Sequence, residues 1–342
     1  MRTFFSEDHR LHFPQAELSG GQFVTPYERP SRVEYVLNRL KETGLTDIVD
    51  PGPVDMAPAR KLLDPGFLSF LETAWNDWKA AGMAGEIIAA NVPARGMHLD
   101  RIPTNIDGKV GYYCHASETA ITRGTWAAAQ SSLASAQAAQ RHVAGGARSA
   151  FALCRPPGHH ATADQYGGYC FLNNAAIVAQ MFRDAGARPA ILDIDFPHGN
   201  GTQNLFYDRG DVLFASLHGA PQDAYPYFLG YKDETGTGPG EGANLNYPMP
   251  PGTAYAAWSE ALDDAIARIT AWGADALVVS LGVDAYKDDP ISFFKLDSPD
   301  FADAGRRIGR MGLPTVHCME GGYAIEAVGI NTVNVLQGFL DA

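Results

Sequence analysis

The sequence predicts an α/β protein with a central parallel sheet that carries helices on both faces. Short apolar runs bounded by turn residues alternate with longer helical patterns through the second half of the 342-residue chain. Each run is almost continuously hydrophobic, as expected of a strand that is covered on both faces. Regular alternation of strands and helices favours parallel pairing of the strands.

The expected strands cover residues 149–154, 190–194, 212–217, 276–281 and 315–319. The expected helices cover residues 125–145, 174–186, 253–273 and 299–312. Thr125 and Thr253 are the expected N-caps of two of these helices, and the glycines that close the helices are the expected C-caps. Residues 82–115 and 231–242 have little period and are expected to be loops; a loop as long as the first is usually functional or disordered.

Composition argues against several classes of protein. With 46% hydrophobic residues the chain can bury a large core, yet it has no apolar run of about 18 residues, so no membrane span is expected. The first residues lack the apolar core of an export signal, which predicts a cytoplasmic location. A net charge of −13 disfavours nucleic acid as a partner and suits cationic ligands. The four cysteines lack the spacing of a zinc knuckle and are expected to be buried free thiols.

Polar motifs follow directly on four of the expected strands. They are Arg155–His160, Asp193–Asn200, Gly282–Asp284 and Glu320–Tyr323. Ligands of open parallel sheets bind outside the carboxyl ends of the strands, where all four motifs are expected to lie. The shared position indicates one functional site assembled from distant parts of the chain.

These motifs contain the side chains of a hydrolytic metal site. Asp195 and Asp284 could hold zinc if an imidazole joined them and one position stayed open for water and substrate. The adjacent His159 and His160 suggest a division between a general base and acid and an electrostatic partner. Tyr323 could donate a hydrogen bond to a developing oxyanion.

Other polar residues are expected to support this site or to be structural. Asp193 and Asn200 could orient the two imidazoles through their second ring nitrogens. A histidine outside the motifs is more often structural than catalytic, and those read as non-catalytic are His9, His12, His98, His115, His142, His218 and His317.

With these motifs, the chain resembles the arginase–deacetylase superfamily, in its histone-deacetylase-like branch, and within it the bacterial acetylpolyamine amidohydrolases. Beyond the four motifs the resemblance rests on Ser6–His9, Phe70–Gly82, Gly111–Cys114, Gly167–Asn174 and Asp289–Lys295. It implies a three-layer fold in which residues 1–342 form a single catalytic domain. It also implies that the inserted loop at about 82–115 serves dimerisation and substrate selection.

The resemblance implies a role for each matching residue. His160 corresponds to the general base and acid, His159 to its electrostatic partner and Tyr323 to the phenol that polarises the amide carbonyl. Asp195 and Asp284 correspond to zinc ligands. The implied substrate-binding residues are Asp107, Glu118, Gly168, Tyr169 and Tyr225. Structural potassium is implied near Asp193, Asp195 and Ser216, and at a second site near Phe206, Arg209 and Val212.

One position departs from the pattern of the family. The motif calls for a metal-binding histidine where this chain has Pro197, which has no side-chain donor atom. Three explanations are open at this point: an introduced or accidental change, since one base converts a His codon to a Pro codon; a natural, metal-poor protein that binds its ligand without hydrolysis; or a site in which His198 takes over as ligand. The last is disfavoured because neighbouring residues of an extended segment point opposite ways.

The expected function is metal-dependent hydrolysis of the acetyl amide of acetylpolyamines or similar cationic acetylated amines, releasing acetate. The expected partners are this substrate and a second copy of the chain. The first alternative is a catalytically silent polyamine-binding protein, and the second is a deacylase for another acylated amine or acyl-lysine. Retained ligand binding without turnover would indicate the first, and turnover of long peptides would indicate the second.

Overall fold

The computed structural model describes residues 1–342 and confirms the α/β prediction. Its main sheet has eight strands, all parallel to their neighbours. In spatial order they are β4 (Ile48–Val49), β1 (Arg2–Phe4), β5 (Ser149–Ala152), β10 (Thr315–Met319), β9 (Ala276–Leu281), β6 (Pro189–Asp193), β7 (Leu213–Gly219) and β8 (Asn244–Met249).

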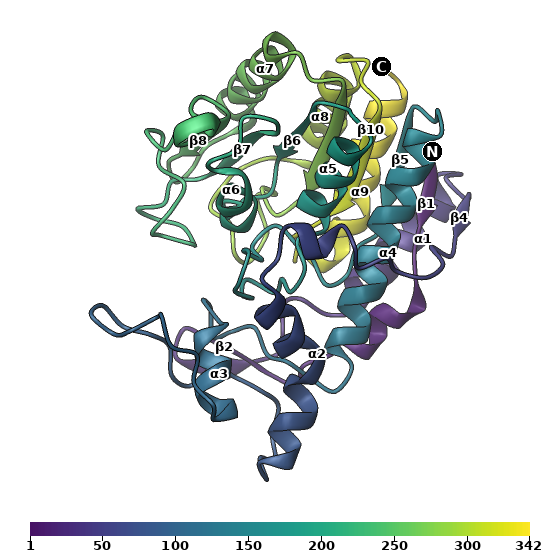
Figure 1. Cartoon of the computed structure of the whole chain (residues 1–342). Helices are drawn as coiled ribbons and strands as arrows, with labels where there is room; N and C mark the ends of the chain where they lie inside the picture. Colours follow the sequence, from purple (N-terminus) through teal and green to yellow (C-terminus); the bar gives the residue numbers. More distant parts are fainter.

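Helices cover both faces of this sheet (Figure 1). One layer consists of α4 (Thr125–Ala144), α5 (Asn174–Asp184) and α6 (Asn200–Phe206). The other consists of α1 (Ser31–Glu42), α7 (Tyr255–Trp272), α8 (Ser298–Gly309) and α9 (Ile325–Leu340). Figure 1 shows a further group below the sheet, made of α2 (Pro65–Ala80), α3 (Ile106–Tyr112) and the hairpin of β2 (Glu17–Ser19) and β3 (Gln22–Val24). None of the helices combines the length and hydrophobicity that a membrane crossing needs.

The central strands are the ones that the sequence marks most clearly. Every residue of β5, β6, β9 and β10 is buried, which explains their uninterrupted apolar runs. Three outer strands were not predicted. β1 and β4 are too short to show a pattern, and β8, at the sheet edge, mixes buried and half-buried residues without an uninterrupted apolar run. All four cysteines are buried and free, as predicted.

The predicted N-caps are wrong. Thr125 is the first residue of α4, and its hydroxyl accepts the N–H of Thr122 at 2.7 Å instead of capping the helix. Thr253 lies outside α7, and its hydroxyl donates to the carbonyl of Pro250 at 2.7 Å. Gly273 does end α7, in the left-handed conformation that a glycine adopts without strain.

The segment 82–115 is not irregular throughout, because it contains α3. The Asn105 side chain accepts the N–H of Asp107 and so caps this short helix.

The order of the sheet brings the predicted site together. β5, β10, β9 and β6 are consecutive neighbours, and each polar motif follows one of them. The carboxyl ends of parallel strands meet at one edge of the sheet. The four motifs therefore converge although they come from residues 155 to 323.

Candidate active site

A cavity of about 350 Å³ lies at this edge of the sheet, and we call it the central cavity. The predicted residues that line it are Glu118, His160, Gly168, Tyr169, Asp195, Pro197, Tyr225 and Tyr323. Further lining residues that the sequence did not point to are Glu17, Tyr27 and Asp223, while Ile291 and Phe293 belong to the block Asp289–Lys295 of the family resemblance. The cavity is thus lined by a buried carboxylate and an imidazole, and by aromatic side chains.

The two adjacent histidines are held by different partners. The His159 Nδ1 lies 3.0 Å from Asp193 Oδ2, and the His160 Nδ1 lies 2.6 Å from Asn200 Oδ1. Their ring centroids are 3.9 Å apart. Burial lowers the pKa of His159 to about 3 and lowers that of His160 well below its ordinary value. Both imidazoles are therefore neutral near pH 7, and their outer nitrogens carry lone pairs if the Nδ1 atoms hold the protons.

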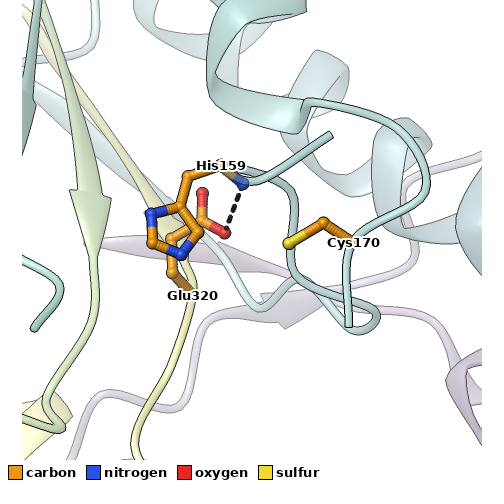
Figure 2. A group of neighbouring side chains, drawn as sticks. All are labelled: His159, Cys170 and Glu320. Carbon is orange, nitrogen blue, oxygen red and sulfur yellow. Dashed lines mark hydrogen bonds between the residues drawn. The ribbon is translucent and has the colours of Figure 1, made fainter. Parts of the chain in front are cut away.

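Glu320 fixes the loop that carries these histidines. Its carboxylate accepts the backbone N–H groups of Gly158, at 2.6 Å, and of His159, at 3.2 Å, the second of which is drawn in Figure 2. Its other oxygen accepts the hydroxyl of Ser280 at 3.3 Å. Burial raises the pKa of Glu320 to about 8. The end of β10 is thereby tied to the loop after β5.

Two buried carboxylates approach each other beside the histidines. Asp195 Oδ2 accepts the N–H of Gly321 at 2.7 Å, while Asp284 Oδ2 is buried with no hydrogen-bond partner. A Cβ on Gly321 would lie 2.3 Å from Asp284 Oδ2 and 2.7 Å from Asp195 Oδ2, so only glycine fits here. Burial and neighbouring carboxylates raise the pKa of both aspartates well above its ordinary value. Such a pair is stabilised as anions when a cation binds between them.

The site falls one protein ligand short of a usual catalytic zinc centre. Such centres have three protein ligands and an open position, and here Asp195 and Asp284 fit as two of them. Pro197 lines the cavity but offers no side-chain donor. His198 does not line the cavity; its Nε2 lies 3.1 Å from Asn246 Oδ1 and its ring packs against His218 at a centroid distance of 4.5 Å. The adjacent imidazole therefore does not replace the missing ligand.

A second group of potential ligands lies deeper. His159, Cys170 and Glu320 each offer an atom within 4.8 Å of the others (Figure 2). The Cys170 thiol donates to the Gly168 carbonyl at 3.2 Å, and burial raises its pKa well above its ordinary value. The Glu320 oxygens already accept hydrogen bonds. None of the three lines the central cavity, so this group offers no open position for substrate.

The Tyr323 phenol is positioned by residues from distant segments. Asp289 accepts the N–H of Tyr323 at 2.7 Å. The guanidinium of Arg32 lies 4.8 Å from the centre of the Tyr323 ring and donates to the carbonyl of Gly322 at 2.7 Å. Arg32 was not predicted, since an isolated arginine at the start of a helix has no sequence signature. Its position over the ring face is typical of a cation–π contact.

Acidic side chains lie on the cavity wall. Glu118 accepts the N–H of Gly168 at 3.1 Å, and burial raises its pKa. Glu17 accepts the Tyr169 hydroxyl at 3.1 Å, and burial raises its pKa to about 7. Asp107 does not line the cavity of the single chain; it lies on α3 and accepts a hydrogen bond from Asn91 at 3.2 Å.

The remaining predicted residues lie behind the cavity or shape it. The Tyr225 ring stands at 89° to that of His160, with centroids 4.9 Å apart. Asp193 and Ser216, both named for the first potassium site, are paired across β6 and β7. The residues named for the second potassium site, Phe206, Arg209 and Val212, lie on the stretch from the end of α6 to the start of β7.

Comparison with known proteins gives the family. The histone deacetylase domain matches residues 26–339. The chain belongs to the histone deacetylase family. It is 56% identical to the acetylpolyamine amidohydrolase of Mycoplana ramosa over 339 residues, covering 99% of each chain. It is 55% identical to acetylpolyamine amidohydrolase 1 of Pseudomonas aeruginosa over 341 residues, again covering 99% of each.

A solved structure supports the same placement. The crystal structure of acetylpolyamine aminohydrolase from Burkholderia pseudomallei superposes with a TM-score of 0.94 at 40% identity, covering 99% of this chain and 98% of the other. The predicted superfamily and three-layer fold are thereby confirmed. Zinc dependence is the norm in this family.

Proposed function

We propose that this chain hydrolyses the acetyl amide of acetylpolyamines or similar cationic acetylated amines, releasing acetate and the free amine. The observation that carries the proposal is the content of the central cavity. It is lined by Asp195 of the carboxylate pair, by a neutral histidine and by a phenol, and acids lie on its wall. The relatives named acetylpolyamine amidohydrolase support the same substrate class.

The proposed mechanism assigns proton transfer to His160. A divalent metal held by Asp195 and Asp284 would polarise the amide carbonyl and make water more acidic. His160, with Nδ1 directed to Asn200, takes the proton of the attacking water at Nε2 and delivers it to the leaving amine. The Tyr323 hydroxyl donates to the oxyanion, and the guanidinium over its ring favours that donation.

The proposed recognition of substrate uses the walls of the cavity. Tyr169 and Tyr225 would flank the alkyl chain, while Glu17 and Glu118 would attract an ammonium group. The Gly168 carbonyl, which accepts from Cys170, would also face the substrate amide.

Beyond a single chain, we propose a homodimer formed through the loop 82–115, which would bring Asp107 to the cavity mouth. Exposed apolar side chains on this loop, Met83, Val92, Met97, Leu99 and Ile102, support it. We also propose potassium at the two sites named above. The cytoplasmic location stays a prediction.

Substrate affinity is expected to depend on pH through Glu17. Its pKa of about 7 means that the carboxyl is neutral below and charged above that pH. Since an alkylammonium remains charged near pH 7, KM for acetylputrescine should fall as pH rises from 6 to 8. Glu17→Gln should flatten this dependence. Steady-state kinetics across this range check it, and an unchanged profile in the variant would assign the dependence to another group.

The central test compares the native chain with Pro197→His. The substitution restores an imidazole at the position where the family motif has its metal-binding histidine, so zinc affinity should rise at least about tenfold. Turnover of acetylputrescine should rise with it. Pro197→Ala is the matched control, because it relaxes the backbone as any substitution of proline would but adds no donor. Metal content and acetate release are measured on the same samples.

The outcomes separate the alternatives. If the native chain binds acetylputrescine without hydrolysis and Pro197→His restores turnover, the native protein is a silent polyamine-binding protein. Faster turnover of long acetyl-lysine peptides than of acetylputrescine would favour a deacylase for another substrate. Failure of zinc-loaded Pro197→His to release acetate from acetylputrescine would show that the proposed function is wrong.

A further inference from the structure

Because Pro197 cannot bind a metal through its side chain, the third protein ligand of the metal must be a different residue from the one in the family motif. A cation between Asp195 and Asp284 would meet two carboxylates and no nitrogen donor, whereas zinc in proteins is usually joined by imidazole or thiolate. A third donor would have to lie in the buried surroundings of the carboxylates and be free of other partners. Its assignment rests on the metal site of the proposed function.

The outer nitrogen of His159 meets this requirement. His159 Nε2 lies 3.5 Å from Asp195 Oδ1, and the structure gives it no hydrogen-bond partner. Two ligand atoms on one tetrahedral zinc ion, each about 2.0–2.2 Å from the metal, are separated by about 3.3–3.6 Å. The spacing between this nitrogen and this carboxylate oxygen is thus the spacing of two ligands on one ion.

The inner nitrogen of His159 is held as in metal-binding histidines. Its Nδ1 lies 3.0 Å from Asp193 Oδ2 on β6. A metal-binding histidine almost always donates its other ring N–H to a carboxylate or carbonyl, which fixes the tautomer and the orientation of the ring. The His159 backbone N–H is fixed as well, by Glu320. The ring is therefore oriented before any metal binds.

Other nearby donors are less suited. His198 Nε2 lies 3.1 Å from Asn246 Oδ1, and its Nδ1 has no hydrogen-bond partner, but neither nitrogen lies within 4.0 Å of a carboxylate oxygen as His159 Nε2 does. Figure 2 shows Cys170 and Glu320 beside His159, but the thiol donates to a backbone carbonyl and the carboxylate accepts two backbone N–H groups. His160 lines the cavity, and its free ring nitrogen is needed there to exchange protons with the attacking water and the substrate.

We propose that His159 serves as the third protein ligand, with Asp195 and Asp284, of a divalent metal in this chain. The set of one imidazole and two carboxylates suits zinc better than two carboxylates alone. His159 then no longer acts as a free electrostatic partner, and His160 is the only imidazole left for proton transfer. Pro197 has changed which histidine binds the metal.

Zinc affinity in two backgrounds tests this assignment. The full-length native chain, His159→Ala, Pro197→His and the double variant are titrated with Zn²⁺ against a chelating indicator at fixed pH. In the native background His159→Ala should weaken binding at least about 100-fold, more than loss of an orienting partner alone. In the Pro197→His background, where another imidazole is available, His159→Ala should weaken zinc binding less than about fivefold.

Controls address folding and the choice of ligand. Thermal unfolding of the metal-free proteins checks the fold, and His159→Gln, which keeps a side chain able to donate to Asp193, serves if His159→Ala unfolds. X-ray absorption of the zinc-loaded native chain should show one histidine ligand, lost in His159→Ala and retained in His160→Ala. That readout reports coordination and not turnover.

Several results would overturn the proposal. They are an equal loss of affinity in both backgrounds, no loss in either, loss on His160→Ala, or absence of zinc binding by the native chain. The assay uses zinc alone, so it does not depend on the substrate. If the ligand assignment holds but zinc-loaded protein releases no acetate from acetylputrescine, the proposed function fails while His159 remains a ligand.

Discussion

Replacing His160 by alanine should lower kcat for acetylputrescine by about 10²- to 10⁴-fold, the usual contribution of a general acid–base group. The physical reason is its position. His160 is the histidine of the adjacent pair that lines the central cavity, and its Nδ1 lies 2.6 Å from Asn200 Oδ1, which leaves Nε2 for the proton. Acetate release is measured in the Pro197→His background, where turnover is expected to be highest.

Zinc content, measured on the same samples, distinguishes a role of His160 in proton transfer from a role in metal binding. Zinc content should be unchanged by His160→Ala, because this histidine is not one of the proposed ligands. His142→Ala is the matched control, since His142 lies in the last turn of α4 and does not line the central cavity. A loss of only a few-fold in kcat would mean that another group accepts the proton of water.

Much of the site could be predicted because it follows the best-marked strands. The strands β5, β6, β9 and β10 are buried along their whole length, so their apolar runs are visible in the sequence. Since parallel strands end at the same edge of the sheet, the polar residues just past each run could be expected to meet. His160, Asp195 and Tyr323 do line one cavity.

Most of the residues that were missed come from the first 32 positions. Glu17, Glu28 and Arg32 lie outside the strand-end motifs, and no spacing connects them to the histidines or to Tyr323. Their place is set by long-range packing of the first segment against the sheet edge, with Arg32 bonded to the carbonyl of Gly322. Such contacts carry no local periodicity. The N-caps failed for a related reason, since both threonine hydroxyls were taken by nearby turns.

Pro197 shows a different limit. The sequence alone indicates that a metal ligand is absent at this position. It does not indicate which other side chain lies close enough to the two aspartates to bind the metal instead. The distance from His159 to Asp195 depends on how the loop after β5 is held, and Glu320 holds it from β10. His159, which corresponds to an electrostatic partner in the family, can therefore take a different role when the histidine expected at position 197 is replaced by proline.

Replacing Glu28 by glutamine should destabilise the protein by about 3–5 kcal/mol, as expected when a buried ion pair loses one partner. The side chains of Glu28, Arg32 and Arg155 are almost fully buried, and Glu28 Oε1 lies 3.0 Å from Arg32 and 2.8 Å from Arg155. Burial would raise the pKa of Glu28, but the two guanidinium groups lower it, so the carboxylate is charged. Without that charge two buried cations would face each other. Denaturant unfolding at pH 7 measures the change.

Glu34→Gln is the matched control, because Glu34 pairs with Arg10 at the surface, where an ion pair is worth about 0–1 kcal/mol. Equal effects of the two substitutions would mean that the buried network does not contribute as described. The network also connects the two halves of the site: Arg155 begins the motif of the histidine pair, and Arg32 lies over the Tyr323 ring. Glu28→Gln should therefore reduce kcat more than KM even at temperatures where the variant is folded, whereas a purely structural role would leave the turnover of the folded fraction unchanged.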